Sequence, residues 1–447
     1  MGCCNRRCGL IAGAVIGAAV AILGGVLIPV GNSIIEGTVK QEAVIEPGTT
    51  AYDNWVSTGA FVYRQLWLFD VKNPIEVIEY GAVPVVVEKG PYTYKIRYLP
   101  KENISFHANH TAAFLLPQGA IFEPSLSVGP EEDEVTSLNV AVAAAYSLIP
   151  QGLHILLEKW IKNSNSSLFQ RRTIKELLWG YRDPILNETI GLFSPVSKHS
   201  DKTQTRPVVL NDTISSTQSS SANASSFPPF VKKKQLLYFF SSDICRSVSA
   251  AYEQTLDLKG IKVYRYTLQQ STLASPTINP DNKCFCRDMK VTQNCTLAGA
   301  LDISSCQQGR PIYISLPHFL YGSASLREHV LGLQPSEEHH FTFLDVEPTT
   351  GFTLRFAKRI QVNMVYGPSK IITVLKKVKN YTIFPLVWLN ETASVDDETA
   401  QMFKDELISR IQMLDVVQKA LLGIGVSVFC LCLIAYFVVR RREGKLA

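Results

Sequence analysis

The sequence predicts a mainly β domain with a small helical cap, carried between two membrane-spanning helices. Two uncharged apolar runs, one near each end of the chain, predict the spans, because each is long enough to cross about 30 Å of hydrocarbon. Residues 63–73 and 353–365 alternate apolar and polar side chains, which is the pattern of half-buried strands. Apolar positions at helical spacing between residues 135 and 180 predict the cap.

The first apolar run covers residues 9–31 and follows a basic head, residues 1–8, that contains Arg6 and Arg7. By the positive-inside rule, we expect this head to lie in the cytosol. A cleaved signal peptide is the alternative. The run is longer than a signal core of roughly 7–15 residues, and no A-x-A-like cleavage site follows it. These features favour an uncleaved anchor.

The second apolar run covers residues 420–439 and is followed by a basic tail, residues 440–447. A buried core helix is the alternative. Three consecutive arginines directly after an uncharged run favour a second span whose C-terminal end is also cytosolic. The domain between the spans, residues 32–419, is then expected outside the cytosol.

The net charge belongs to the two tails. The chain has 44 basic and 39 acidic residues, and the tails hold six of the basic residues and one of the acidic ones, so the outer domain is neutral. This balance gives no support to nucleic-acid binding, whereas the basic tails suit anionic cytoplasmic lipids. N-glycosylation sequons lie only between the spans, which indicates a lumenal or extracellular domain. They stand at Asn103, Asn109, Asn165, Asn187, Asn211, Asn223, Asn294, Asn380 and Asn390.

Five cysteines of the outer domain fall within one window: Cys245, Cys284, Cys286, Cys295 and Cys306. Disulfides are one interpretation, and a zinc site that uses Cys284 and Cys286 is the other. The oxidising compartment favours disulfides. Because the number is odd, one thiol is expected to have no partner.

Strands and helices are predicted in order along the outer domain. Strands at 83–88 and 92–98 are joined by a turn at 89–91. The acidic segment 131–134 is expected to begin a helix that continues to residue 149. A second helix has its apolar stripe at Leu153, Leu156, Leu157, Trp160 and Ile161, with His154, Glu158, Lys159 and Lys162 off that stripe. A short third helix is predicted at 172–180.

The second half of the outer domain begins with a Ser/Thr-rich loop, residues 194–226. On the strand 353–365, Lys358 falls on the apolar side, which indicates a bulge or an inward-facing amine. Further strands are predicted at 371–378 and 381–389. A helical pattern from residue 402 leads into the second span.

No motif in the chain requires an enzyme, and no cofactor is expected. The cluster Glu337-Glu-His-His340 could ligate a metal, but it lacks the H-E-x-x-H spacing, so a solvated charged loop is favoured and no metal site is predicted. No nucleophile elbow or phosphate-binding loop occurs. We therefore expect a binding protein.

Long strings in the chain resemble the class B scavenger receptor family. They include YRQLWLFDVKNP at 63–74, KGPYTYKIRYL at 89–99, GRPIYISLPHFLYG at 309–322 and EPTTGFTLRFAKRIQVN at 347–363. The resemblance implies a large antiparallel β-barrel-like ectodomain with an apical helical bundle, about residues 134–180, and a hydrophobic tunnel. It also implies ligands and partners: long-chain fatty acids, oxidised and native lipoproteins, anionic phospholipids, thrombospondin-type proteins and cytosolic signalling kinases.

The resemblance implies a receptor at the cell membrane, in lipid rafts and in the Golgi during transit, that facilitates fatty acid uptake. An adhesion or signalling receptor without efficient lipid transport is the alternative. The family's apical lysines align with the stretch 159–167, where this chain has Asn163 and Asn165. Lys159 and Lys162 are the nearby candidates for ligand contact, so weaker binding of oxidised lipoprotein is expected than in relatives that keep those lysines. Thrombospondin-type contact is implied for Glu131, Glu132, Asp133 and Glu134.

The covalent sites implied by the resemblance are the following. Cys286 pairs with Cys295 and Cys245 with Cys306, which leaves Cys284 unpaired or with an unknown partner, because its family partner lies in a segment that the Ser/Thr-rich run replaces. Palmitoylation is implied for Cys3 and Cys8, with Cys4 as an additional site, and not for Cys430 and Cys432, which lie inside the second span. Thr93 matches a phosphorylation site.

Overall fold

The computed structural model describes residues 6–57, 61–97, 99–107, 111–192, 204–210, 226–241, 243–244, 246–307 and 309–443. The chain forms two compact units. The first consists of the chain up to Tyr52, the short stretch Asp257–Ile261 and the chain from Asp396 onwards. The second consists of Asp53–Leu256 and Lys262–Val395.

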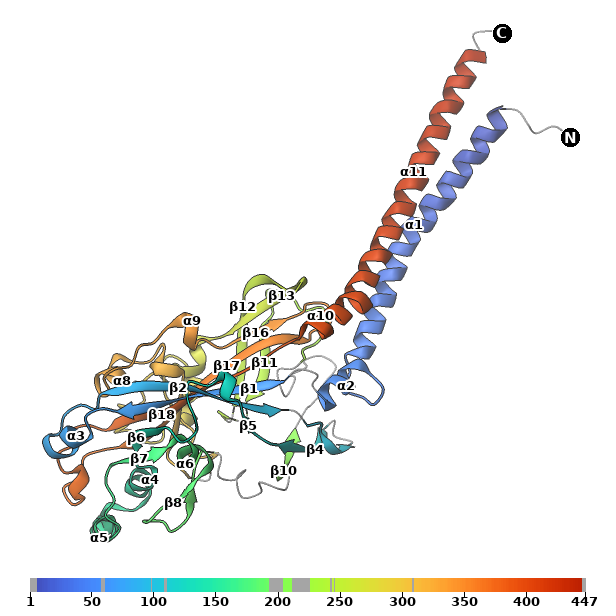
Figure 1. Ribbon diagram of the computed structural model, residues 1–447. Helices are drawn as coiled ribbons and strands as arrows, with labels where there is room; N and C mark the ends of the chain where they lie inside the picture. Colours follow the sequence, from blue (N-terminus) through green and yellow to red (C-terminus); the bar gives the residue numbers. More distant parts are fainter. Residues whose placement is uncertain are drawn as a thin grey trace. The chain divides into compact units, whose positions relative to one another are not determined.

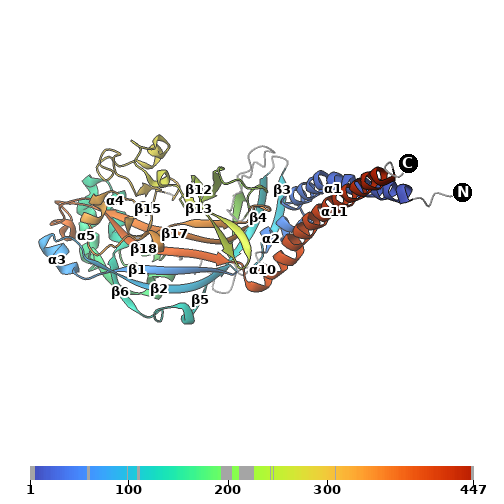
Figure 2. The same ribbon diagram turned by 90° about the horizontal axis from the view of Figure 1, so that it is seen from above.

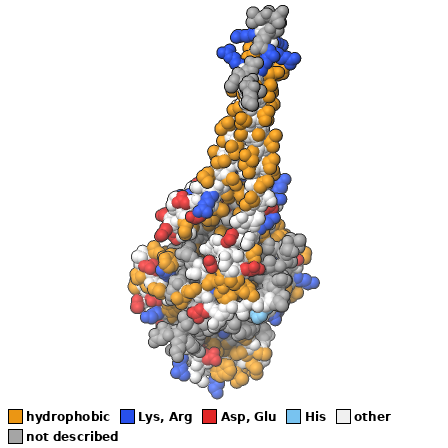
Figure 3. Space-filling view, turned by 90° about the vertical axis from the view of Figure 1, so that its right-hand side faces the viewer, with side chains coloured by type: hydrophobic (Ala, Val, Ile, Leu, Met, Phe, Trp, Pro, Cys, Tyr) orange, Lys and Arg blue, Asp and Glu red, His pale blue; other side chains and the backbone are white. Residues whose placement is uncertain are grey.

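The first unit is built on two long apolar helices, α1 (Arg6–Glu42) and α11 (Ser409–Glu443), which lie side by side (Figures 1 and 2). Both are long and apolar enough to cross a membrane. Glycine allows the backbones to approach closely: a Cβ atom on Gly24 would lie 2.5 Å from the backbone nitrogen of Leu422. Figure 3 shows hydrophobic side chains along this pair and basic side chains gathered near one end.

Shorter elements complete the first unit. Helix α10 (Asp397–Phe403) begins at Asp396, whose side chain accepts a hydrogen bond from the Thr399 backbone N–H, so Asp396 is a helix N-cap. One π-helical turn (Lys404–Ile408) joins α10 to α11. Helix α2 (Thr50–Val56) begins in this unit and ends in the second.

The second unit is organised by a large antiparallel sheet of eleven strands, several of which run alongside one another in Figure 2. Its main path is β11 (Leu237–Ser241), β12 (Arg246–Leu258), β13 (Ile261–Leu268), β16 (Phe343–Val346), β17 (Thr353–Tyr366), β18 (Thr382–Ser394), β1 (Val62–Val71), β2 (Val86–Arg97) and β5 (Ile121–Phe122). Off this path, β14 (Leu301–Asp302) pairs with β15 (Ile312–Ser315), which also pairs with β17. Among the described strands the two ends of the path do not pair, so the sheet is open and not a closed barrel.

Smaller elements surround this sheet. The remaining strands are β3 (Glu102–His107), β4 (Thr111–Gln118), β6 (Glu134–Leu138), β7 (Phe169–Thr173), β8 (Tyr181–Arg182), β9 (Thr189–Ile190) and β10 (Gln204–Leu210). The remaining helices are α3 (Pro74–Tyr80), α4 (Val140–Leu148), α5 (His154–Asn163), α6 (Ile174–Trp179), α8 (Ala324–Glu328) and α9 (Glu337–His340). The largest apolar cluster joins the sheet to α4 and α5, and it includes Phe69, Val142, Leu157, Ile161 and Phe384.

Three predicted elements differ in the structure. The turn expected at 89–91 is part of the continuous strand β2, and Pro91 is accommodated beside a register shift opposite Leu66 and Leu68. The strand expected at 371–378 is a 3-10 turn, Thr373–Leu375, with bends around it. Within the expected Ser/Thr-rich loop, β10 pairs with β4; most of the rest of that loop lies outside the described residues.

Lys358 is an inward-facing amine and not a bulge, because the register of β17 is continuous around it. Its Nζ lies 2.7 Å from Asp243 Oδ2 and 3.2 Å from Glu391 Oε2. Burial alone would lower the pKa of Lys358, but these two carboxylates outweigh it and the pKa is raised. The cation therefore keeps its charge beside these carboxylates, on the face of β17 that also carries Phe356 and Ile360.

Candidate functional site

The candidate ligand-binding surface is the helical cap, where α4, α5 and α6 gather beside one end of β1, β2 and β18 (Figures 1 and 2). Helix α4 starts at Asn139, whose side-chain oxygen accepts hydrogen bonds from the backbone N–H groups of Ala141 and Val142. The acidic segment expected to begin this helix instead leads into strand β6, which pairs with β7. The helix therefore begins later than its acidic residues suggest.

Helix α5 buries a different face from the one its apolar stripe predicts. His154, Leu157, Glu158 and Ile161 are buried, whereas Leu153, Leu156 and Trp160 are exposed. This orientation of α5 buries one carboxylate, Glu158, and one imidazole, His154, and it leaves large apolar side chains facing solvent.

Specific hydrogen bonds, one set to a distant segment and one to the preceding turn, explain this orientation. Glu158 accepts hydrogen bonds from the backbone N–H of Thr373, at 2.8 Å, and from the Thr373 hydroxyl. His154 Nε2 lies 3.0 Å from the backbone oxygen of Ile149. Burial would raise the pKa of Glu158, but the hydrogen bonds from Thr373 and Lys162 outweigh it and hold the pKa below its usual value. Satisfied in this way, the polar groups can be buried.

Exposed side chains at and near α5 form a surface that we call the apical patch. It consists of one cation, Lys159, and five apolar residues: Leu148, Leu153, Ile155, Leu156 and Trp160. Ile155 is 67% exposed and Trp160 is 49% exposed. Ile155, Leu156, Lys159 and Trp160 are neighbours by their spacing on one side of α5, and exposed apolar patches are candidate sites of protein or lipid interaction.

The two candidate cations at the cap are not equivalent. Lys162 Nζ lies 2.9 Å from Glu158 Oε1, so part of its charge is compensated. Lys159 is exposed and makes no ion pair among the described residues. Asn165, a sequon residue, follows the end of α5 and is exposed. Lys159 is therefore the cation best placed to meet an anionic ligand at the apical patch.

The acidic segment 131–134 is largely engaged within the chain. Glu131 accepts hydrogen bonds from the Tyr94 hydroxyl at 2.7 Å and from Trp179 Nε1 at 2.9 Å. Asp133 accepts one from the Tyr92 hydroxyl at 2.7 Å. Burial is the largest of the influences that raise the pKa of both tyrosines, and these carboxylates add to it.

The other two acidic residues of this segment are exposed. The Glu134 carboxylate lies 2.6 Å from the Arg171 guanidinium. The Glu132 side chain makes no hydrogen bond or ion pair with the part of the chain that the structure describes. The accessible negative charge for a basic partner is thus Glu132 and Glu134.

Thr93 lies in β2 and is fully buried. Its hydroxyl donates to the Leu126 backbone oxygen, and its backbone N–H donates to the Ser127 hydroxyl at 2.9 Å. Phosphorylation at Thr93 therefore requires the turn around residues 124–127 to open first.

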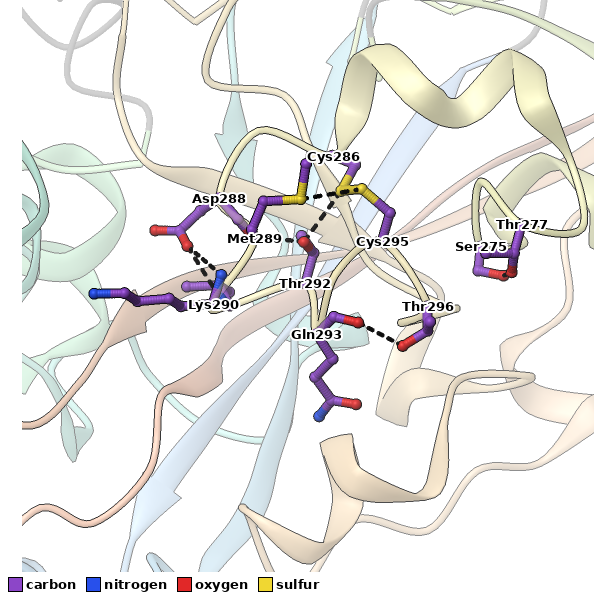
Figure 4. The surroundings of a disulfide bond; sticks show 11 residues. Ser275, Thr277, Cys286, Asp288, Met289, Lys290, Thr292, Gln293, Cys295 and Thr296 are labelled. Atoms are coloured by element: carbon purple, nitrogen blue, oxygen red, sulfur yellow. Dashed lines mark hydrogen bonds between the residues drawn. A yellow bond between two sulfur atoms is a disulfide. The ribbon is translucent and has the colours of Figure 1, made fainter.

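A disulfide joins Cys286 and Cys295, the pair that the resemblance implies (Figure 4). Cys284 is exposed and is not in a disulfide. Cys306 is disulfide-bonded, and Cys245 lies outside the described residues. A zinc site formed by Cys284 and Cys286 does not fit, because the Cys286 sulfur is already bonded to Cys295.

The sequons occupy two kinds of position. Asn103, Asn165, Asn187, Asn294 and Asn380 are exposed. Asn390 is half-buried within β18, and its Nδ2 donates to Gln65 Oε1 at 2.9 Å, so a glycan there would have to replace this hydrogen bond. Asn109, Asn211 and Asn223 lie outside the described residues.

The cysteines outside the disulfide window lie in the head, where acylation is expected, and in the second span, where it is not. Cys3 and Cys4 lie outside the described residues, whereas Cys8 lies near the start of α1 and is half-exposed. Cys430 and Cys432 lie within α11.

One cluster missed by the sequence reasoning contains Glu88, His318 and His340, whose ligand atoms all lie within 4.8 Å of one another. His318 Nε2 lies 2.6 Å from Glu88 Oε2. The two imidazole rings are stacked, with centroids 4.5 Å apart and planes within 9° of parallel. A metal ion must lie in the plane of each imidazole that binds it, and two stacked parallel rings share no such point. The cluster as arranged therefore does not suit a metal.

Together these features define a class of protein: a membrane protein with two terminal spans and a large, disulfide-containing β domain between them, capped by helices with an exposed apolar surface. The sequence profile of the CD36 family matches residues 15–205 and 190–436. The chain therefore belongs to the CD36 family, the family of class B scavenger receptors.

Individual relatives cover most of the chain. Scavenger receptor class B member 1 of Cricetulus griseus is 29% identical, over 92% of this chain and 86% of its own length. Lysosome membrane protein 2 of Rattus norvegicus is 30% identical, over 83% of this chain and 82% of its own. Lysosome membrane protein 2 of Homo sapiens is 30% identical, over 88% of this chain and 87% of its own. These relatives support the assignment of α1 and α11 as spans.

Proposed function

We propose that this chain is a cell-surface receptor that binds oxidised lipoproteins and anionic phospholipids at the apical patch and facilitates the uptake of long-chain fatty acids. The observation that carries the proposal is the exposed face of α5, where Ile155, Leu156 and Trp160 surround Lys159. A surface with apolar side chains and a cation that makes no ion pair with any residue the structure describes complements a lipid particle, whose surface offers acyl chains and anionic headgroups.

The orientation in the proposal places both termini in the cytosol. Arg6 and Arg7 flank the start of the first span, and Arg440, Arg441 and Arg442 follow the second. All nine sequons lie between the spans, where a lumenal or extracellular domain would carry them.

Uptake of a fatty acid needs an apolar route, and the sheet offers apolar side chains for one. Phe356, Val362 and Leu389 are only partly buried and lie on one face of β17 and β18. Each methylene transferred from water to such a surface contributes about 0.8 kcal/mol. A long acyl chain would then be retained by burial alone.

The apical patch is tested by replacing its most exposed apolar side chain, Ile155, together with its largest one, Trp160. We expect Ile155→Ser combined with Trp160→Ser to lower the binding of labelled oxidised lipoprotein to expressing cells at least tenfold, because losing the two contacts removes about 2–4 kcal/mol. The matched control is Ile278→Ser, which changes an isoleucine that is 74% exposed outside α4 and α5. Unchanged binding by the double variant, at equal surface expression, would refute the role of the patch.

The cation has a separate test. Lys159→Ala is expected to reduce binding severalfold and to make the remaining binding less sensitive to salt, because exposed charges are screened within about 8 Å at physiological ionic strength. Lys175→Ala, an exposed lysine in α6, is the control. Binding with the same affinity and the same salt dependence in Lys159→Ala would contradict a role for this charge.

Adhesion through thrombospondin-type proteins is the second candidate function, favoured by the exposed carboxylates of Glu132 and Glu134. Measurement of palmitate uptake distinguishes a receptor that takes up fatty acid from one that only mediates adhesion. A receptor that only mediates adhesion would bind a thrombospondin-type repeat and take up palmitate no faster than cells that lack the protein.

A further inference from the structure

His318 connects the segment 334–340 to Glu88 of β2, and His340, a residue of that segment, stacks on the His318 ring. His318 Nδ1 accepts a hydrogen bond from the backbone N–H of Gln334 at 3.0 Å. His340 Nδ1 accepts one from the backbone N–H of Ser336, also at 3.0 Å. Both histidine side chains are buried. The first of these bonds joins the segment 334–340 to His318, whereas the second lies within the segment and holds the His340 ring in place. Two backbone donors of the segment therefore depend on unprotonated imidazole nitrogens.

These hydrogen bonds set the protonation state of the two rings. A nitrogen that accepts a backbone N–H carries no proton, so each neutral ring has its proton on Nε2. For His318, that proton points to Glu88, whose Oε2 also accepts a hydrogen bond from Trp388 Nε1 at 2.7 Å. Adding a second proton at Nδ1 would place it against the backbone N–H that now donates there.

We propose that His318 and His340 form an acid-sensitive latch, which fixes the segment 334–340 to the sheet at neutral pH and releases it when the surroundings become acidic. The release follows from protonation of His340 at Nδ1, which removes the acceptor of the Ser336 backbone N–H and places a cation in the buried ring whose centroid lies 4.5 Å from that of His318. The proposal concerns the ectodomain sheet and does not depend on the ligand of the apical patch.

The groups that face the pair come from four elements, three of which carry titratable or charged side chains. Glu88 on β2 favours a protonated imidazole, whereas His339 on α9 and Arg359 on β17 disfavour one, as does each ring of the pair toward the other. On β18, Trp388 packs edge-on against both rings. Burial is the largest influence and, with the neighbouring cations, it lowers the pKa of His340 to about 4. Burial raises the pKa of Glu88, but hydrogen bonds from His318 and Trp388 outweigh it, so this carboxylate stays ionised.

The direction of the pH effect follows from the difference between the closed and open forms. An exposed histidine titrates near 6.5, and His340 in the closed latch titrates near 4. Above pH ~6.5 both forms are neutral and the latch is fully stable. As the pH falls from ~6.5 to ~4, the open form gains protons first, and the ratio of open to closed increases on the order of 100-fold.

The released segment has defined limits. On one side, Leu331 remains bound to β2 through backbone hydrogen bonds with Pro84 and Val86, and Gly332, with a φ of 95°, provides a turn beside it. On the other side, β16 begins at Phe343. Within the segment, Tyr321 donates to Glu337 Oε1. An acidified endocytic compartment would therefore expose this segment and the sheet surface beneath it while the rest of the domain stays folded.

The test is hydrogen–deuterium exchange of peptides covering residues 332–341 in the full-length protein in detergent micelles, at about pH 7 and about pH 4, corrected for intrinsic exchange rates. In the unmodified chain we expect protection of this segment to fall at least tenfold in acid. His340→Asn is expected to keep its protection, because the amide oxygen takes the place of Nδ1 and does not titrate. The matched control is His339→Asn, the exposed neighbour, which should behave as the unmodified chain does.

A second variant keeps the proposal testable if His340→Asn folds poorly. Glu88→Gln removes the carboxylate that favours protonation, so the pH of release should move downward, whereas a pair with only a structural role would be weakened equally at every pH. The proposal is overturned if the segment of the unmodified chain stays protected at the lower pH. It is also overturned if Glu88→Gln releases the segment at an unchanged pH.

Discussion

Asp345→Asn is expected to lower the free energy of unfolding of the ectodomain by about 3–5 kcal/mol, the range for breaking a buried charge network from one side. Asp345 is fully buried in β16. It accepts hydrogen bonds from Arg265, at 2.7 and 2.8 Å, and from Arg355 at 2.6 Å.

The network joins three neighbouring strands, which explains the size of this effect. Asp345 stands opposite Arg265 of β13 and Arg355 of β17 in the sheet register. A third guanidinium, that of Arg359, lies with the other two around the ring of Phe343. An amide at position 345 would leave these partly buried cations without a negative charge between them, and cations removed from solvent without compensation are costly.

Urea denaturation of the purified protein, followed by tryptophan fluorescence, measures the change as a lower midpoint. Asp397→Asn is the matched control, because the Asp397 carboxylate is 93% exposed and its ion pair with Lys259 is solvated. No measurable loss is expected there. A midpoint that is the same for Asp345→Asn and for the control would show that the three strands are held by packing alone.

Cys286→Ser is expected to destabilise the domain by about 2–3 kcal/mol, the value for a disulfide that closes a short loop. Cys286 and Cys295 are nine residues apart in the sequence. The loop carries the sequon residue Asn294 and packs onto the domain through Val291, which is buried. Without the bond, the unfolded chain gains freedom, and the serine leaves Cys295 as an unpaired thiol.

The comparison variant for the disulfide is Cys284→Ser, two residues away. Its thiol is exposed and makes no disulfide, so the denaturation midpoint should be unchanged. Both variants are compared with the unmodified chain by urea denaturation without reductant, with surface delivery scored by mature glycans. Equal midpoints for the two variants would mean that the Cys286–Cys295 bond adds nothing to stability.

The sequence pattern was sufficient to predict an element wherever one hydrophobic periodicity extended over many residues. The two spans and the strands around Tyr63–Val71 and Thr353–Val365 could be predicted, because burial against lipid or against one side of a sheet imposes a repeat that the residues themselves display. The family also followed from the sequence, since long strings of residues carried the resemblance.

Helix α5 is an element whose buried face could not be predicted from its hydrophobic pattern. Its stripe of leucines and Trp160 predicted a buried face, but the orientation is decided by Glu158 and Thr373, which are 215 residues apart in the chain. The same holds for Thr93, whose burial depends on a turn more than thirty residues further on. A hydrogen bond between distant segments leaves no trace in local periodicity.

The sequence by itself determined the two terminal spans and the family, because hydrophobic length and long strings of residues are local properties. Charge at the span ends and sequons are local too, and they predict the compartment. Only the tertiary structure decided that the apical patch is exposed, that the sheet is open, and that Glu88, His318 and His340 meet. These three residues come from segments separated by up to 252 positions. Their meeting depends on how the fold brings β2, the turn after β15 and α9 together, and that is a property of packing, not of any single stretch.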